Sequence, residues 1–462
     1  MRAQVLKKEG FAGVDESSPK GHLGRLIPTA AAPYLAKFRA SSPQAYKLAH
    51  GTFWSLIGVA TPRAIGVLAS IIVARLLGVE GFGAYGIIQS TIGMFATFAG
   101  YGLGTTAAKH IAQYRTVDPD RAGRVLAAAM VITVAVGILT SGALLAASPF
   151  LAQHTLGAPG LTGILRFSAA LVFLTVLSGA QTGMLTGFEA FKKNAQVNVI
   201  GALSVLPLTV LGTYFFGLMG SVAALTASTA LTCVVSHIAI SGEARRLGVP
   251  ARYSTCHQEW TTITGFSIPT ILGSMGQGTA TWMCYSMLVN RPNGYGQMGL
   301  FNASNQWFAA IMFVPGLLNR VTLPALSESF AVAGRQGARK VLVLTFKFNT
   351  AVMVPLVLVA SLLSPWIMAF YGPSFVGAWP VLVMALFTAG CFALESPVYQ
   401  ALLAEGRPWT VFWFDIGLSL VVLLLTASLV NHGAMGLATA RLISYSGHSV
   451  CLLSYFLLIG SK

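Results

Sequence analysis

The sequence predicts an all-α polytopic membrane protein with about twelve transmembrane helices. Only 9% of its 462 residues are charged and 55% are hydrophobic, whereas a soluble domain carries about 25% charged residues. Apolar runs of roughly 20 residues, the length at which a helix crosses a bilayer core, recur from residue 51 to the end. A membrane β-barrel would instead show alternating segments of about ten residues. Composition therefore excludes a soluble domain and favours a helical bundle.

Twelve apolar runs are long enough to cross a membrane. The expected spans are residues 51–77, 82–108, 121–149, 161–187, 194–215, 218–241, 260–289, 296–319, 340–369, 376–403, 408–430 and 434–459. Spans 1–6 form an expected N-lobe (51–241) and spans 7–12 an expected C-lobe (260–462), joined by a cytoplasmic linker at 242–259. Residues 1–50 are basic, contain no signal-peptide core, and are expected to form a flexible cytoplasmic tail.

The basic residues of the loops lie on one side of the expected membrane. The tail and the even-numbered loops are rich in Lys and Arg, whereas Arg291 is the only Lys or Arg in the odd-numbered loops. Lys and Arg in short loops stay on the cytoplasmic side, so both termini are expected in the cytoplasm and the protein in the cell (inner) membrane. The net charge of +16 mostly reflects this asymmetry. It favours contact with anionic lipid headgroups over nucleic acid.

The sequence shows no pattern typical of a catalytic, metal or cofactor site. Its five cysteines have no paired spacing, and no cluster of His, Cys, Asp and Glu has the spacing of metal ligands. A membrane polysaccharide polymerase or glycosyltransferase would need acidic groups on its outer face, yet the longest outer loop, near 150–160, has no carboxylate. An enzyme is therefore disfavoured, and neither a metal nor a cofactor is expected.

The two expected lobes repeat with a single offset. Residues 216 positions apart match at Arg75 and Arg291, Arg124 and Lys340, Ser148 and Ser364, Glu189 and Glu405, and Gly217 and Gly433. Because each repeat contains six spans, an even number, the lobes should share one orientation and be related by an axis along the membrane normal. Transporters built in this way hold substrate between their lobes, whereas a scaffold has less need of the duplication.

Several segments resemble the Wzx-like polysaccharide flippases of the multidrug/oligosaccharidyl-lipid/polysaccharide exporter superfamily. They include ARLLGVEGFGAYGIIQS, GYGLGTTAAKHIAQYR, LTGFEAFKKNAQVNVIGAL, TLPALSE and LLAEGRPWTVFWFDIGLSL. The resemblance covers residues 48–460 and implies two six-helix lobes around a central cavity. It also implies transport, by alternating access, of a polyprenyl-phosphate- or pyrophosphate-linked oligosaccharide from the inner to the outer leaflet. The product would be a surface polysaccharide such as lipopolysaccharide O-antigen, with a polymerase and chain-length machinery as partners.

Charged residues inside the expected spans normally face a cavity or a partner. They are Arg63, Arg75, Arg166, Arg320, Lys347, Glu395, Asp415 and Arg441. Six are basic and two acidic, so internal pairing alone cannot neutralise them. A cavity that accepts a phosphate or pyrophosphate would need this excess, since guanidinium groups bind phosphate oxygens by bidentate hydrogen bonds. The nearest alternative in the same superfamily is an antiporter of multidrug or organic cations. The excess of basic groups disfavours it, because these groups would repel a cationic substrate.

Arg63 is the first candidate for binding the phosphate. It follows Pro62, which removes a helical hydrogen bond and loosens the turn before it. The alternative is a structural ion pair with Asp415 or Glu395. These two carboxylates are themselves candidates for proton coupling or gating, because desolvation lets a buried carboxylate take up a proton near neutral pH. For them, too, the alternative is a structural ion pair.

Three further arginines are candidates for substrate binding. Arg441 lies about a third of the way into the last span, where the side chain reaches the headgroups with difficulty, so it is expected in the cavity. Arg75 and Arg291 occupy equivalent repeat positions and are expected at the outer mouth of the cavity. The alternative for these two is contact of the guanidinium with lipid headgroups.

The topology is testable with reporter fusions. Fusions after Pro159 and after Pro373 should read as external, and fusions after Lys193 and Arg246 as cytoplasmic, because Lys and Arg mark the cytoplasmic loops. Alkaline phosphatase and green fluorescent protein activities report the two sides. Reversal at two of the four positions would contradict the expected orientation.

Overall fold

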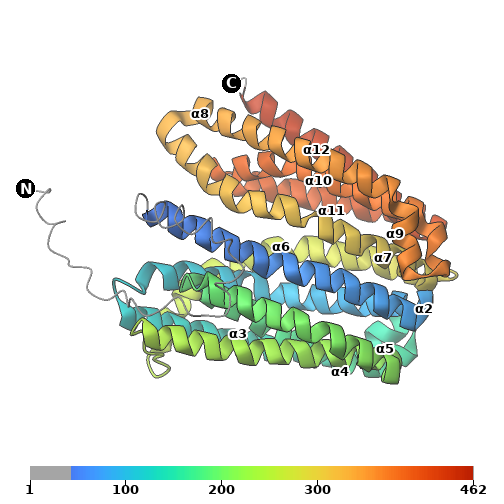
Figure 1. The fold of residues 1–462 in the computed structure, drawn as a ribbon, viewed down its shortest axis with the longest axis horizontal. Coiled ribbons are helices and arrows are strands. Elements are labelled where there is room, and N and C mark those ends of the chain that lie inside the picture. Colours follow the sequence, from blue (N-terminus) through green and yellow to red (C-terminus); the bar gives the residue numbers. More distant parts are fainter. Residues whose placement is uncertain (1–42, 461–462) are drawn as a thin grey trace, which may run out of the picture. The chain divides into compact units, whose positions relative to one another are not determined.

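The computed structural model describes residues 43–460 of the chain, and these residues form helices joined by short turns, without a strand (Figure 1). Residues 1–42, most of the expected tail, lie outside the described residues. The first helix begins at Pro43, before the expected start of the first span at residue 51. The chain divides into two units, residues 1–53 and 54–462.

The helices follow the apolar runs of the sequence. In chain order they are α2 (Pro43–Tyr114), α3 (Pro119–Phe150), α4 (Thr162–Gly187), α5 (Phe191–Arg246), α6 (Trp260–Val289), α7 (Gly294–Ile311), α8 (Phe313–Leu362), α9 (Ser364–Tyr371), α10 (Trp379–Ala404), α11 (Pro408–Leu429) and α12 (Gly433–Gly460). Proline lies in the first turn of α3, α9, α10 and α11, where its missing N–H would have had no helical partner.

A single glycine with positive φ interrupts each of three long helices. Gly78 (φ 69°) divides α2, Gly217 (φ 55°) divides α5 and Gly334 (φ 59°) divides α8. Glycine adopts this conformation without the steric cost that other residues carry, so two helical segments can meet there in a tight turn. Gly78 and Gly217 lie between expected spans 1 and 2 and spans 5 and 6. Gly433, the repeat equivalent of Gly217, also has a positive φ, of 65°.

Prolines divide two of the expected spans. Helices α7 and α8 meet at Met312, inside the expected span 296–319. Pro315 lacks the N–H that would bond to the carbonyl of Ile311, the last residue of α7. The expected span 340–369 is divided in the same way at Leu363, and Pro365 follows in the first turn of α9.

Seven helical stretches of the described residues are long and apolar enough to cross a membrane. They are Leu56–Thr97, Pro119–Thr155, Pro159–Gly187, Phe191–Arg246, Gln336–Leu362, Pro373–Ala404 and Pro408–Leu458. Three of them, the first, fourth and last, each contain parts of two expected spans. The chain is therefore a multi-pass helical membrane protein, as the sequence predicts. Helices α6 and α7, at expected spans 7 and 8, are not among these stretches.

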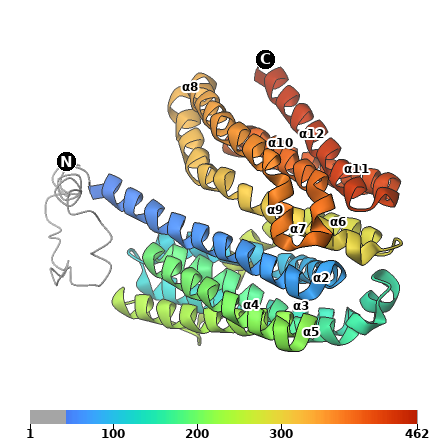
Figure 2. The same ribbon diagram turned by 45° about the vertical axis from the view of Figure 1, so that its right-hand side comes forward.

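The described helices pack as an N half (residues 54–246) and a C half (residues 260–460). In the N half, α4 packs against α3 and α5. In the C half, α10 packs against α7, α8 and α12, and α11 packs against α6 and α12. In Figures 1 and 2 the blue-to-green helices of the N half lie on one side of the yellow α6 and α7, and the orange-to-red helices lie on the other.

The expected linker, residues 242–259, is held against the N half by buried carboxylates. Glu259 is 4% exposed and pairs with Arg121 at 3.0 Å. Glu243 is 3% exposed and pairs with Lys193 at 2.7 Å. A buried charge is stable only when it is paired, so these contacts anchor the linker to the N half, from which α6 then enters the C half.

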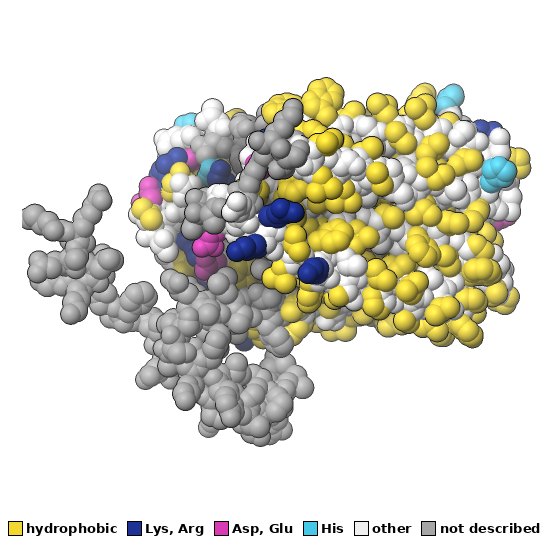
Figure 3. All heavy atoms as spheres, turned by 90° about the horizontal axis from the view of Figure 1, so that it is seen from above, with side chains coloured by type: hydrophobic (Ala, Val, Ile, Leu, Met, Phe, Trp, Pro, Cys, Tyr) yellow, Lys and Arg dark blue, Asp and Glu magenta, His cyan; other side chains and the backbone are white. Residues whose placement is uncertain are grey.

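The surface of the described residues separates apolar from charged side chains. Figure 3 shows hydrophobic side chains over most of the visible face and charged side chains mainly toward one end, beside the undescribed atoms. The ion pairs of Lys and Arg among the described residues lie in or beside expected cytoplasmic loops. This distribution suits a protein whose middle faces lipid, where an unpaired charge is costly.

Candidate functional site

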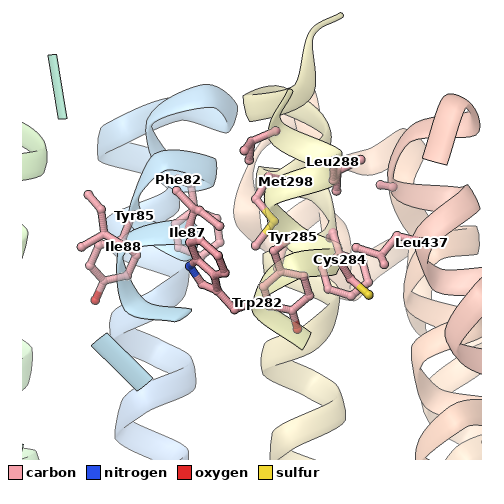
Figure 4. Packing of buried hydrophobic residues seen from close by; sticks show 14 of the residues in the cluster. Phe82, Tyr85, Ile87, Ile88, Trp282, Cys284, Tyr285, Leu288, Met298 and Leu437 are labelled. Atoms are coloured by element: carbon pink, nitrogen blue, oxygen red, sulfur yellow. The ribbon is translucent and has the colours of Figure 1, made fainter. Parts of the chain in front are cut away.

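Both halves contribute to one hydrophobic core at the predicted outer end. The predicted outer end is the end of the second unit that carries Gly78, Asn290 and Gly372. These residues lie in or next to the odd-numbered loops, which are expected to face outward. The largest cluster of buried hydrophobic residues lies there and contains Phe82 of α2 and Trp282 of α6. Figure 4 shows side chains of α2, α6 and α7 meeting in this cluster. The halves therefore share a packed core at this end.

Toward the opposite end, the described buried residues form two hydrophobic clusters. One cluster contains N-half residues such as Leu103 and Val125, joined by Ile263 at the start of α6. Another contains only C-half residues, including Leu326 and Leu452. The hydrogen bonds between the two halves that involve described residues also lie at the predicted outer end. The described halves are thus closed together at that end.

Two polar contacts in this closure are related by the internal repeat. Arg75 Nε donates to the carbonyl oxygen of Phe370, near the end of α9, at 2.6 Å. Asn290 Nδ2 donates to the carbonyl oxygen of Thr155 at 2.6 Å, where the helical turn that continues α3 ends. The repeat offset of 216 relates the two donors, Arg75 and Asn290, to within one residue. It also relates the two acceptors, Thr155 and Phe370, to within one residue. Each half therefore supplies a donor to the free carbonyls at a helix end of the other half.

Buried hydrogen bonds reinforce the closure. The hydroxyls of Ser70 and Tyr371 lie 3.2 Å apart. Trp282 Nε1 donates to Thr91 Oγ1 at 2.8 Å. All four side chains belong to residues that are at most 8% exposed, so water does not compete for these bonds, and losing one partner would leave the other unsatisfied.

Arg63 lies on the face of α2 that points toward the C half. It precedes Ser70 by seven residues, and positions seven apart share one face of a helix, about 10 Å apart along its axis. Ser70 contacts Tyr371 of the C half. Gly66, on the same face, has open space where a side chain would lie. Arg63 is exposed, and its guanidinium makes no ion pair with any described residue, so an unneutralised cation lies below the closure.

Arg441 lines a small pocket inside the C half, between α6, α11 and α12. Its Nη1 donates to Asn305 Oδ1 at 2.8 Å, and its guanidinium carbon lies 4.8 Å from the centre of the Phe308 ring. Amide and aromatic contacts of this kind stabilise a guanidinium. The cavity has a volume of about 20 Å³, so in this conformation it admits no more than a very small group.

The four candidate arginines do not converge on one site. Arg75 is part of the closure through its bond to Phe370. Arg291, its repeat equivalent, is exposed and its side chain makes no hydrogen bond or ion pair with a described residue. Arg63 and Arg441 lie on opposite halves, away from the loops of the predicted outer end. The internal repeat predicted equivalent positions for Arg75 and Arg291, but their surroundings in the structure differ.

The two membrane carboxylates are not partners of Arg63 in this structure. Asp415, half-buried on α11, accepts a hydrogen bond from Tyr399 Oη at 3.2 Å. Glu395, on α10, is 1% exposed, and its contacts lie within the C half. The ion pair that was the alternative explanation of Arg63 is therefore not formed in this conformation.

Glu395 belongs to a buried polar cluster with two residues of α12. Its Oε2 accepts from Ser449 Oγ at 2.6 Å and lies 2.9 Å from His448 Nδ1. His448 Nε2 has no hydrogen-bond partner among the described residues. The cluster therefore places a carboxylate in hydrogen-bond contact with an imidazole and a hydroxyl inside the C half. Sequence analysis did not single out His448, because a lone histidine on an apolar helix gives no signal of its partner.

The chain is similar in sequence to known polysaccharide biosynthesis and export proteins. Residues 48–330 match the family described as "Polysaccharide biosynthesis protein". The chain is 25% identical over 354 residues to the EPS I polysaccharide export inner membrane protein EpsE of Ralstonia nicotianae, covering 75% of this chain and 78% of that protein. It is 24% identical over 392 residues to the succinoglycan biosynthesis transport protein ExoT of Rhizobium meliloti, covering 83% and 73%.

Solved structures share the helical architecture. One is the inward-facing conformation of a multidrug resistance MATE family transporter of the MOP superfamily, with a TM-score of 0.72 and 17% identity over 88% of this chain and 98% of that one. Another is the lipid II flippase MurJ in an inward closed conformation, with a TM-score of 0.67 and 15% identity over 87% of each chain. At these identities the likeness concerns the fold alone.

The different surroundings of Arg75 and Arg291 predict different mutational effects. Arg75→Gln should lower the unfolding temperature by about 1–2 °C, because it removes an exposed charge-assisted hydrogen bond of about 1 kcal/mol. Arg291→Gln, the matched control at the equivalent repeat position, should leave it unchanged. Thermal unfolding of both variants in the same detergent measures the difference. Equal shifts would mean that the bond between Arg75 and Phe370 contributes nothing.

Proposed function

The chain belongs to the polysaccharide biosynthesis protein family, and we propose that it is a flippase for a lipid-linked oligosaccharide. It moves a glycan carried on polyprenyl phosphate or pyrophosphate from the inner to the outer leaflet of the inner membrane. The glycan then enters the synthesis of a surface polysaccharide such as O-antigen or an exopolysaccharide. The names of the relatives, which denote export and transport, support a transporter over an enzyme.

The observation that carries the proposal is the position of Arg63. A charge at bilayer depth costs roughly 3 kcal/mol on insertion scales, and no described carboxylate neutralises this one. A phosphate on the lipid carrier offers the missing counter-charge and matches the planar guanidinium. Arg441, on the other half, supplies a second cation. We assign the phosphate to Arg63 and a contact with the carrier or its glycan to Arg441.

The arrangement of the two halves supports alternating access. The proposed architecture is twelve spans in two six-helix lobes, with both termini cytoplasmic. The hydrogen bonds between described residues of the two halves lie toward the predicted outer end. The described buried residues at the other end form two hydrophobic clusters. A substrate would enter the space between the halves near Arg63 from the cytoplasmic leaflet. It would leave after the contacts at the predicted outer end have opened. Anionic lipids would contact the basic cytoplasmic loops, and a polymerase with chain-length machinery would take the exported glycan.

Two polar clusters of the C half are suited to coupling. Asp415 with Tyr399, and Glu395 with His448, each place a carboxylate beside a hydrogen-bonding side chain. A change in protonation would change the charge of the C half while substrate crosses. We propose that these carboxylates couple transport to an ion gradient, or gate it.

An antiporter of multidrug or organic cations is the second candidate. The fold likeness to the MATE transporter fits either function. The unpaired Arg63 and the half-buried Arg441 would repel a cationic substrate, whereas they attract an anionic lipid carrier. The enzyme alternative, a membrane polymerase or glycosyltransferase, has no support in the contacts of the described residues.

The role of Arg63 is testable in cells that depend on this chain for surface polysaccharide. Arg63→Ala should abolish export at normal protein levels, and Arg63→Lys should retain a part, because lysine keeps the charge but loses the planar fork. Arg166→Gln removes another exposed arginine at the start of α4 and serves as the matched control. Full export by Arg63→Ala would contradict phosphate binding. Loss of export in Arg63→Gln with full recovery in Arg63→Gln combined with Asp415→Asn would instead favour a structural ion pair.

A further inference from the structure

The second segment of α2 and helix α7 cross in backbone contact at the predicted outer end. A Cβ atom built on Gly83 would overlap with the carbonyl oxygen of Tyr295 and lie 2.9 Å from the backbone nitrogen of Gly299. A Cβ atom on Gly299 would overlap with the carbonyl oxygen of Val79. Only glycine permits such an approach, which brings the Cα–H groups of one helix against the carbonyls of the other.

This crossing obeys the internal repeat. Gly83 and Gly299 are 216 residues apart, and so are Val79 and Tyr295. Gly83 contacts the carbonyl of Tyr295, and Gly299 contacts the carbonyl of Val79. Each contact is therefore the repeat equivalent of the other. Such reciprocity places the local symmetry axis of the two halves between the two glycines. Sequence comparison at this offset had not singled out these residues.

One position of the crossing breaks the symmetry and interlocks the helices. Gly86 on α2 corresponds to Asn302 on α7 at the same offset. A Cβ atom on Gly86 would lie 2.8 Å from Asn302 Cγ, so the asparagine side chain fills the space that the glycine leaves. Asn302 is 7% exposed, and its Nδ2 lies 3.5 Å from the carbonyl oxygen of Phe82.

We propose that the crossing of Gly83 and Gly299 is the outer gate of the transporter, and that the absence of side chains at these positions sets how firmly the gate closes. The inference rests on the proposed alternating access. In the closed state the backbones touch, which gains dispersion contacts along both helices. A methyl group at either glycine forces the helices apart, and it destabilises the closed state without affecting a state in which the halves have separated at this end.

The symmetry gives the proposal a specific consequence. Gly83→Ala and Gly299→Ala perturb equivalent contacts, so their effects on the gate should be equal in direction and similar in size. Other glycines of α2 are not equivalent. Gly93 has no atom within 4 Å of its built Cβ, so Gly93→Ala adds the same methyl group to the same helix without touching the C half.

The test measures access to Ser70, which is 6% exposed in the closed state. In the full chain with its five cysteines replaced by serine, Ser70→Cys is labelled by a membrane-impermeant maleimide from the predicted outer side. Gly83→Ala and Gly299→Ala should each accelerate labelling about tenfold, while Gly93→Ala should leave the rate unchanged. Asn302→Ala, which removes the interlocking side chain, should accelerate labelling to a smaller extent.

The outcomes separate the gate from the transport proposal, because labelling requires no glycan. Rates for Gly83→Ala and Gly299→Ala equal to that of Gly93→Ala would overturn the gate, as would acceleration by only one of them. If either alanine variant fails to insert, Asn302→Ala decides: faster labelling supports the gate and an unchanged rate contradicts it. Faster labelling without any glycan export by the parent chain would keep the gate and reject the flippase.

Discussion

The close approach of two backbones at Gly83 and Gly299 is the constraint on which the rest of the structure depends. Where α2 and α7 touch, the aromatic side chains around them pack into one core shared by both halves. The polar contacts of Arg75, Asn290 and Trp282 fall within this region because the helices are held at that distance. A wider crossing would lengthen every one of these bonds. At the other end the described buried residues form two hydrophobic clusters instead of one.

The placement of charge follows from the same geometry. Arginine at the closed end finds the free carbonyls of a helix terminus, as Arg75 does at Phe370. Arginine inside the C half is stabilised by an amide and by aromatic rings, as Arg441 is. Arg63 lies two helical turns before Ser70 on α2, and it has no ion-pair partner among the described residues. Because Arg63 has no counter-charge among the described residues at bilayer depth, we propose that the anionic substrate binds there.

Much of the fold could be predicted from the sequence, and the site only in part. Hydropathy located the helices, and Gly78 and Gly217 fell between predicted spans because apolar runs stop where a turn is needed. The divisions of the eighth and ninth expected spans were missed, although Pro315 and Pro365 signalled them. The different surroundings of Arg75 and Arg291 could not be predicted, since the partner of Arg75 is a backbone carbonyl 295 residues away in the sequence. With 49 glycines in the chain, spacing alone could not select Gly83 and Gly299.

Translocation of a lipid-linked glycan by the purified chain can be measured in liposomes. The purified full chain is placed in liposomes containing a polyprenyl-pyrophosphate-linked oligosaccharide, and an impermeant oxidant measures how much glycan becomes accessible with time. The account predicts that inner-leaflet glycan becomes accessible faster than in protein-free vesicles, and that Arg63→Ala vesicles behave like protein-free ones. Glycan that stays protected with the wild-type chain, in vesicles that nevertheless transport an organic cation, would contradict the account and establish the antiporter instead.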